Sequence, residues 1–114
     1  MNANLNYQSY IGGGDQYNLN FGHTCTEGAY DLCTDFECFW LLDAIISHQF
    51  SEKVKREPFQ VWKLQRLEDC EFKLTATDGN DNIIAEQHIE FSDFKADEVT
   101  LWNVNRVILL PNEY

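Results

Sequence analysis

Four cysteines and three histidines are the residues of this chain whose types are best suited to binding a metal ion. The closest pairs are His23 with Cys25, spaced H-x-C, and Cys33 with Cys38, spaced C-x4-C. Structural zinc sites favour tight cysteine pairs, and the second pair here falls across a predicted helix boundary. Cys38 and Cys70 lie on predicted apolar faces, where a free cysteine behaves as a small buried hydrophobe. We therefore expect no metal site and no cofactor, with a small Cys/His metal protein as an alternative.

The same residue types could perform nucleophilic catalysis if the fold brought a thiol and an imidazole together. Cys25 with His23 or His48 is the combination that could form such a dyad. None of the four cysteines lies in a nucleophile elbow or in a family-type cysteine signature. We therefore expect no catalytic residue and a protein that is not an enzyme, with a small hydrolase as an alternative.

Carboxylates form the third group that could carry function. Glu27, Asp31 and Asp35 are spaced i, i+4 and i+8, so they would line one face of a helix that reached that far. Carboxylates about 6 Å apart along a helix could imitate the phosphate row of a nucleic acid. A solvated helix face is the simpler interpretation. Asp43 interrupts the longest apolar stretch, and we expect it to be buried or half-buried with a partner such as Arg56, Arg66 or a backbone N–H.

The charge of the chain limits its partners. Residues 1–52 contain seven carboxylates and no lysine or arginine, and the formal net charge of the chain is −11. This balance argues against direct binding to nucleic acid or to an anionic membrane, because both need a basic surface. It favours either solubility alone or a basic protein partner. Residues 53–66 carry five of the eight bases, which either bind an anion or, more simply, balance nearby acids within the fold.

At 114 residues the chain is long enough for one domain. Residues 1–16 are Asn-rich with a Gly12-Gly13-Gly14 joint, which predicts a flexible arm, and residues 17–114 form a single domain. No apolar run approaches the roughly 20 residues of a membrane span. The N-terminus has no basic region or apolar block typical of a signal peptide. We expect a cytoplasmic protein with reduced thiols.

The element pattern predicts the fold class. Capping-box spacings, Thr24 with Glu27 and Thr34 with Glu37, predict a helix near 25–33 and a longer one near 35–49. A short strand is expected near 17–21. Alternation of period two predicts further strands at 59–64, 70–77, 83–91, 99–102 and 106–110. Helices followed by consecutive strands predict an α+β fold, with N-terminal helices packed on one face of an antiparallel sheet of about four to six strands. The residues expected to be buried are Trp40, Leu41, Leu42, Ile45, Phe72, Leu74, Ile89 and Leu109.

Several local strings resemble an uncharacterised family of small bacterial proteins, a domain of unknown function also found on mobile elements. These strings are Thr26-Glu27-Gly28-Ala29, Phe39-Trp40-Leu41-Leu42-Asp43-Ala44-Ile45, Phe59-Gln60-Val61-Trp62, Asp78-Gly79-Asn80 and Leu109-Leu110-Pro111-Asn112-Glu113-Tyr114. The resemblance covers roughly residues 20–114. It brings no known activity or catalytic residue, but the occurrence on mobile elements favours a protein that acts on host machinery.

We therefore expect a non-enzymatic, acidic protein-binding module, with Glu27, Asp31 and Asp35 as its partner-binding residues. Its most concrete form is an inhibitor of a bacterial nucleic-acid-binding defence complex, of the anti-CRISPR or anti-restriction type. Such an inhibitor would act by steric block or by nucleic-acid mimicry. The alternative is a housekeeping or plasmid-maintenance protein whose acidity serves only solubility.

Overall fold

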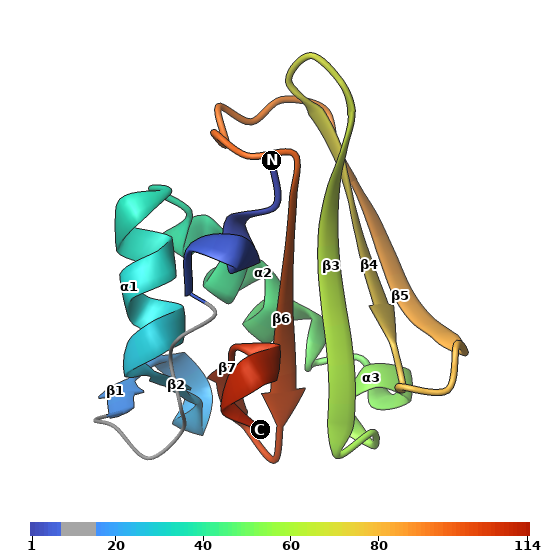
Figure 1. The fold of residues 1–114 in the computed structure, drawn as a ribbon. Helices are drawn as coiled ribbons and strands as arrows, with labels where there is room; N and C mark the ends of the chain where they lie inside the picture. Colours follow the sequence, from blue (N-terminus) through green and yellow to red (C-terminus); the bar gives the residue numbers. More distant parts are fainter. Residues whose placement is uncertain (8–15) are drawn as a thin grey trace.

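The computed structural model describes residues 1–7 and 16–114 of the chain. In this part of the chain, seven strands form one mixed sheet with three α-helices beside it (Figure 1). The strand order is β1-β2-β7-β6-β3-β4-β5, in which β2 and β7 pair in parallel and the other neighbours pair antiparallel. The α+β class is confirmed. The expected purely antiparallel sheet of four to six strands is corrected to this larger, mixed one.

The elements have the following bounds. The strands are β1 (Gln16–Asn18), β2 (Thr24–Thr26), β3 (Phe59–Glu68), β4 (Glu71–Thr77), β5 (Ile83–Ile89), β6 (Glu98–Val104) and β7 (Val107–Leu109). The α-helices are α1 (Glu27–Asp35), α2 (Phe39–His48) and α3 (Glu52–Lys55), and the 3-10 turns are η1 (Ala3–Tyr7), η2 (Asn20–Gly22) and η3 (Pro111–Glu113). The sequence predicts N-terminal helices followed by the sheet. This order is corrected, because β1 and β2 precede α1.

The first helix begins at a side-chain cap. Thr26 precedes α1 in an extended conformation, and its hydroxyl oxygen accepts a hydrogen bond from the backbone N–H of Ala29 at 3.2 Å. This contact satisfies one of the backbone donors that a helix start leaves unpaired. The cap is therefore Thr26, two residues beyond the predicted Thr24, and the helix extends to Asp35.

The second predicted capping box does not form. Thr34 instead lies in the last turn of α1, where its hydroxyl donates to the carbonyl oxygen of Tyr30 at 3.0 Å. Glu37 adopts a φ of 53°, in the left-handed region, and this turn separates the two helices. The helix expected at 35–49 consequently spans residues 39–48.

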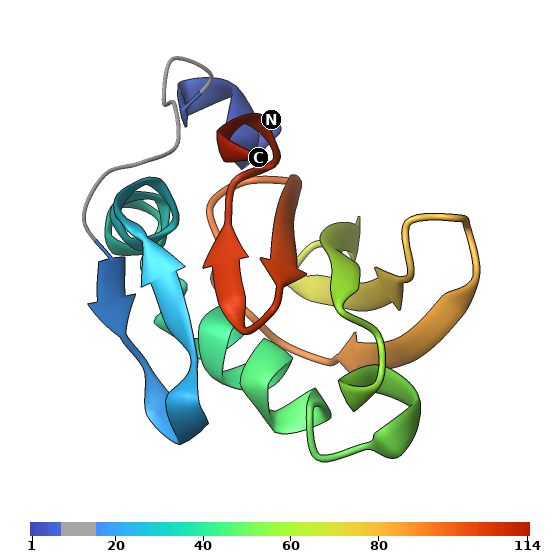
Figure 2. The same cartoon turned by 90° about the horizontal axis from the view of Figure 1, so that it is seen from below.

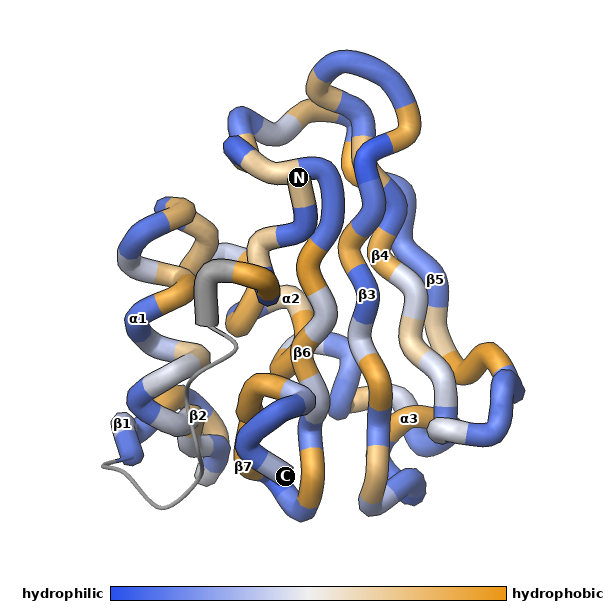
Figure 3. The backbone as a smooth tube through the Cα atoms, viewed as in Figure 1, coloured by the Kyte–Doolittle hydropathy of each residue, from blue (hydrophilic) through white to orange (hydrophobic). Residues whose placement is uncertain are grey.

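Helix α2 runs along one face of the sheet, as Figure 2 shows from below. The core joins buried residues of α1 and α2 with buried residues of strands β2 to β7. Trp62 of β3 pairs with Leu101 of β6 on one side and Ala76 of β4 on the other, and all three are buried. Polar and apolar residues alternate along β3 and β4 (Figure 3), which places alternate side chains in the core. The predicted burial is confirmed for Leu41, Leu42, Ile45, Phe72, Leu74 and Leu109, whereas Trp40 and Ile89 are half-buried.

Strand β5 departs from the predicted alternation. The pairing of β4 with β5 shifts between Ala76 and Thr77, which face Ala85 and Ile83 respectively. Ile84 falls in this irregularity and is buried, while Ile83 is 50% exposed. A one-residue irregularity exchanges the two faces of a strand, so Ile83 lies on the exposed face and Ile84 on the buried one. The strand expected at 83–91 ends at Ile89, and Phe91 lies after it and is 75% exposed.

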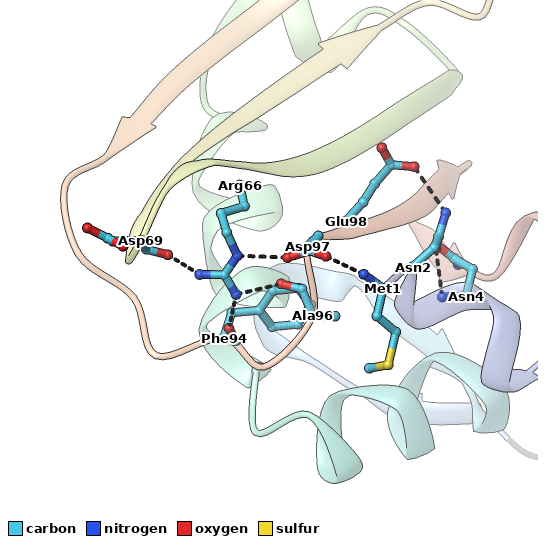
Figure 4. A network of polar contacts seen from close by, with 9 residues as sticks. All are labelled: Met1, Asn2, Asn4, Arg66, Asp69, Phe94, Ala96, Asp97 and Glu98. Atoms are coloured by element: carbon cyan, nitrogen blue, oxygen red, sulfur yellow. Dashed lines mark hydrogen bonds and ion pairs between the residues drawn. The ribbon is translucent and has the colours of Figure 1, made fainter.

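The first residues of the chain pack on the domain. Ala3 is fully buried, and the side-chain amide of Asn4 exchanges hydrogen bonds with the backbone of Thr100 at 2.8 and 2.6 Å. The amino group of Met1 contacts the carboxylate of Asp97 (Figure 4). The arm expected at residues 1–16 thus starts with a docked segment, and its Gly12-Gly13-Gly14 joint lies outside the described residues.

Asp97 lies in the loop between β5 and β6, and Arg66 of β3 holds this loop from the other side. Its guanidinium donates to the carboxylate of Asp97 at 3.0 Å and to the carbonyl oxygens of Phe94 and Ala96 at 2.9 and 3.0 Å (Figure 4). It also lies over the ring of Phe72 at 4.6 Å from the ring centroid. These contacts fix the connection between β5 and β6.

In the described residues, no helix has both the length and the apolar character required to cross a membrane.

Candidate functional site

Helix α1 brings the three predicted partner-binding carboxylates onto one surface. Glu27, Asp31 and Asp35 occupy its first, fifth and ninth positions, so they follow one another at about 6 Å along the helix axis. Asp35 is exposed, and Glu27 and Asp31 are half-buried. The buried residues of α1, which face the core, are Gly28, Ala29, Leu32 and Cys33. The acidic row therefore lies on the side of α1 that is turned away from the core.

Aromatic rings border this acidic row. Tyr30, which lies on α1 between Glu27 and Asp31, stacks on Tyr17 of β1 at 4.0 Å between ring centroids. On its other side Tyr30 contacts Phe39 of α2 edge-on, at 5.1 Å. Tyr17 and Phe39 are 37% and 39% exposed, so parts of both rings reach solvent. Sequence reasoning missed these three rings, because β1, α1 and α2 meet only in the folded chain. We call them, with the three carboxylates, the α1 surface.

Asp43 does not take the predicted position. Its side chain is exposed on α2, although the residues on both sides of it in sequence are largely apolar. The expected partner Arg66 is instead engaged by Asp97. The helical period explains the difference, because Leu42 and Ile46 turn towards the sheet while position 43 turns outward. Asp43 is therefore not a buried carboxylate.

Three of the four cysteines form part of the core. Cys25, Cys33 and Cys38 are fully buried, and all four thiols are free. Burial raises the pKa of Cys25 to about 11, so its thiol stays protonated at neutral pH and is a weak nucleophile. The contact with Cys38, together with burial, raises the pKa of Cys33 as well. His48 contacts the side chain of Gln87 at 2.7 Å and lies beside the ring of Trp62.

A cleft opens at the other end of α2, between η2, α3 and the neighbouring ends of β3 and β6. Its volume is about 340 Å³. The polar residues at its deep end are His23, Gln60 and Asn103, each less than 10% exposed. Phe21 and Phe50, both 70% exposed, stand at its rim with their rings in edge-on contact at 5.1 Å. Pockets that bind small molecules commonly combine apolar walls with a few buried polar groups.

Gln60 organises the deep end of this cleft. Its side-chain oxygen accepts hydrogen bonds from the indole N–H of Trp62 at 2.9 Å and from the amide of Asn103 at 3.2 Å. It also exchanges hydrogen bonds with the side-chain amide of Gln49 at 2.8 and 2.9 Å. Its own amide nitrogen reaches the carbonyl oxygens of Val54 and Glu57, both at 2.9 Å. One buried glutamine thus joins α2, the α3 region, β3 and β6.

Two buried polar atoms beside this network have no hydrogen-bond partner among residues 1–7 and 16–114. They are Nδ1 of His23 and the side-chain oxygen of Asn103. Most buried polar groups in folded proteins are paired, so two orphan atoms in one cleft require an explanation. Burial and the neighbouring Arg106 charge lower the pKa of His23, which keeps its imidazole neutral at pH 7.

The charge of the cleft is opposite to that of the molecule. Lys55, Arg56 and Arg106 line it, against one carboxylate, Glu57. Throughout the described ranges, 1–7 and 16–114, no ion pair connects any of these three cations to a carboxylate. Two of them come from the basic stretch 53–66, and the chain turn between β6 and β7 adds the third. This turn, Asn105-Arg106, has φ of 50° and 71°, which is the backbone of a two-residue hairpin of type I′.

Sequence reasoning recognised the basic stretch but not the cleft. A usable signal was present in the strand alternation. Gln60 is in phase with buried Trp62 and Leu64, and Asn103 is in phase with buried Val99 and Leu101. A polar residue at an inward strand position is either paired in the core or functional. Gln60 and Asn103 also face each other directly in the sheet.

Among the residues that the structure describes, no group of three or more His, Cys, Asp or Glu side chains could hold a metal ion. No curated protein and no solved structure matches this chain at a significant level. A sequence family matches it from residue 1 to residue 114. That match confirms the resemblance and extends it over the Asn-rich N-terminal residues. The chain belongs to DUF6876, a family of unknown function.

Proposed function

We propose that this protein is a cytoplasmic, non-enzymatic binding module that docks the α1 surface onto a basic protein. The observation that carries the proposal is the combination of a carboxylate row on α1 with the partly exposed Tyr17–Tyr30–Phe39 rings beside it. Tyrosine and arginine are enriched among the residues that dominate binding energy at protein interfaces. An arginine of the partner could pair with a carboxylate and stack on an adjacent ring at the same time.

The charge distribution supports the same partner chemistry. The carboxylates of α1 belong to a segment, residues 1–52, that contains no lysine or arginine. With a net charge of −11, the chain attracts a basic protein from a distance and repels other acidic ones. Electrostatic attraction of this kind mainly raises the association rate and selects the partner. It also makes binding sensitive to salt, because charges are screened over about 8 Å at physiological ionic strength.

In its most specific form, the proposal is that the basic partner itself binds nucleic acid. Carboxylates at about 6 Å intervals could occupy the positions that phosphates take on that partner. The module would then block the partner sterically or by mimicry. Competition with DNA or RNA distinguishes this form from docking at a surface that does not bind nucleic acid.

The test compares two variants of equal charge. One carries Glu27→Gln, Asp31→Asn and Asp35→Asn on α1. The matched control carries Asp43→Asn, Glu52→Gln and Glu90→Gln, which neutralises three exposed carboxylates elsewhere. Immobilised wild type and both variants are exposed to a lysate of the cells that express the protein. The retained proteins are identified by mass spectrometry, and their association rates are then measured with purified material.

We expect a basic protein to be retained by the wild type and the control but lost by the α1 variant, with an association rate at least about tenfold lower for that variant. Its binding to the wild type should weaken as salt rises. Equal loss in both variants would show that total charge alone matters. Undiminished binding by the α1 variant would leave the acidity with a solubility role and reject the proposal.

A further inference from the structure

We propose that the cleft beside α3 binds a small organic anion that has a planar body, a carboxylate or phosphate group and a hydrogen-bond donor. Lys55, Arg56 and Arg106 would receive the anionic group, and Phe21 and Phe50 would contact the planar body. This site is separate from the α1 surface, and the inference does not depend on the function proposed for that surface.

The first argument is electrostatic. The chain has eight lysines and arginines in total, and three of them gather around one cleft in a protein whose net charge is −11. Elsewhere, Arg66, Lys73 and Lys95 form ion pairs with carboxylates, and Lys53 and Lys63 are single cations without an ion pair in the described residues. The three cations of the cleft have no such pairs within residues 1–7 and 16–114. Bases that merely balanced neighbouring acids would be expected to lie against them, so the cleft retains capacity for an external anion.

The second argument comes from the deep end of the cleft, and it is independent of charge. The unpaired atoms are Nδ1 of His23 and the side-chain oxygen of Asn103, in residues that are 6% and 3% exposed. An unpaired buried polar atom has lost its hydrogen bonds to water without gaining others, so it destabilises the fold. The neighbouring Gln60 cannot relieve this cost, because both of its side-chain polar atoms are already engaged. A ligand that placed an O–H or N–H group at this end could donate to either atom after a small side-chain rotation.

The third argument concerns shape and the apolar rim. Phe21 and Phe50 are 70% exposed although they touch each other, and Ile46 and Pro58 extend the same apolar wall. Phe21 is held there with a φ of 58°, an uncommon conformation for a bulky residue. Such backbone outliers occur often at binding sites. A volume of about 340 Å³ admits a small metabolite rather than a peptide segment.

The probes are two matched pairs that differ in the anionic group. The first pair is 4-aminobenzoate and its neutral amide, 4-aminobenzamide. The second is adenosine 5′-monophosphate and its neutral nucleoside, adenosine. Each has a planar ring and an amine donor, and the two pairs distinguish a carboxylate from a phosphate ligand. Binding is measured by titration calorimetry on the full chain, and the contacted residues are located by changes in the amide NMR spectrum.

We expect the anionic member of at least one pair to bind about tenfold or more tightly than its neutral counterpart. The spectral changes should centre on η2, α3 and the turn at Asn105-Arg106. The variant Arg56→Gln/Arg106→Gln should lose at least about tenfold in affinity. The control Lys63→Gln/Lys95→Gln, which removes two cations outside the cleft, should bind as the wild type does.

A second variant keeps the test independent of charge. Phe50→Ala removes an exposed ring, so folding should be unaffected, and affinity for the preferred anion should fall several-fold. The proposal is overturned if neither anion binds, if anionic and neutral members bind equally, or if the Arg56→Gln/Arg106→Gln variant binds as tightly as the control.

Discussion

Gln60 makes hydrogen bonds to several groups at the deep end of the cleft. It pairs with Gln49, Trp62 and Asn103 and with two backbone carbonyl oxygens, while being only 2% exposed. We expect Gln60→Ala to lower the free energy of unfolding by at least about 2 kcal/mol, because it leaves several buried polar groups without partners. Chemical denaturation followed by tryptophan fluorescence measures the change.

The control is Gln65→Ala on the same strand. Gln65 is exposed and makes a long 3.4 Å contact with Glu98, so its loss should change the free energy of unfolding by no more than about 0.5 kcal/mol. Equal effects of the two substitutions would contradict the role assigned to Gln60.

At this scale the sequence identified candidate residues by type and could not place them. The spacing of Glu27, Asp31 and Asp35 was enough to put them on one helix, since an i, i+4 relation is local. The cleft unites His23, Arg56 and Asn103, which are far apart in sequence. No local pattern contains that information. It follows from the parallel pairing of β2 with β7 and from the β6–β7 turn.

At the scale of elements, the strands β3 to β6 were predictable because each is at least seven residues long and has a partner strand close in sequence. The pairing of β3 with β6 joins strands that are distant in sequence. The expected strands at 17–21 and 106–110 overlap β1 and β7. Strand β2 was not expected, because three residues are too few to show an alternation. The break between α1 and α2 was also misplaced, since a single left-handed residue, Glu37, ends one helix inside an apolar run.

The strings that carry the family resemblance meet in space. Thr26 donates its hydroxyl to the carboxylate of Glu113 at 2.6 Å. The side chains of Glu113 and Leu110 lie within 3.0 Å of the position that a Cβ atom at Gly28 would take. Gly79, with a φ of 89°, approaches the ring of Phe59 in the same way. The first contact joins the N- and C-terminal strings, the second joins two central strings, and Phe59 in turn contacts the ring of Tyr114 at 5.6 Å. In this chain, these strings therefore make folding contacts with one another.

The loop between β5 and β6 provides a pH-dependent contribution at this scale. The N-terminal amino group and Arg66 lower the pKa of the Asp97 carboxyl below its ordinary value. A carboxyl whose pKa is lower in the folded state stabilises the fold above about pH 4, its ordinary pKa. That contribution disappears as the pH falls through the pKa of the folded state. We expect Asp97→Asn to lower the Tm at pH 7 and to have little effect at strongly acidic pH.

Asp93→Asn is the control for this titration. Asp93 is exposed in the same loop. The difference in Tm between the Asp93→Asn variant and the wild type should stay constant across the pH range. A Tm difference for Asp97→Asn that did not change with pH would mean that the Met1 and Arg66 contacts do not stabilise the loop electrostatically.

For the whole molecule, one apolar core extends through both halves of the chain. It includes residues of η1, α1 and α2 together with inward residues of every strand from β3 to β7, and the buried cysteines lie within it. A core that spans the domain in this way should make the fold independent of cross-links. The cysteines then act as small apolar residues, as their burial and the raised pKa of Cys25 indicate.

We therefore expect thermal melts with and without a chelator, and with and without a reductant, to superimpose. A native disulfide contributes about 2–5 kcal/mol and a structural zinc site considerably more. At about 4 °C per kcal/mol for a domain of about 100 residues, the loss of either would lower the Tm by about 8 °C or more. The matched measurement is a thiol titration in denaturant without reductant, which should find all four cysteines of each chain reactive. Fewer reactive thiols, or a melt lowered by the chelator, would make Cys25, Cys33 and Cys38 a cross-linking or metal-binding cluster.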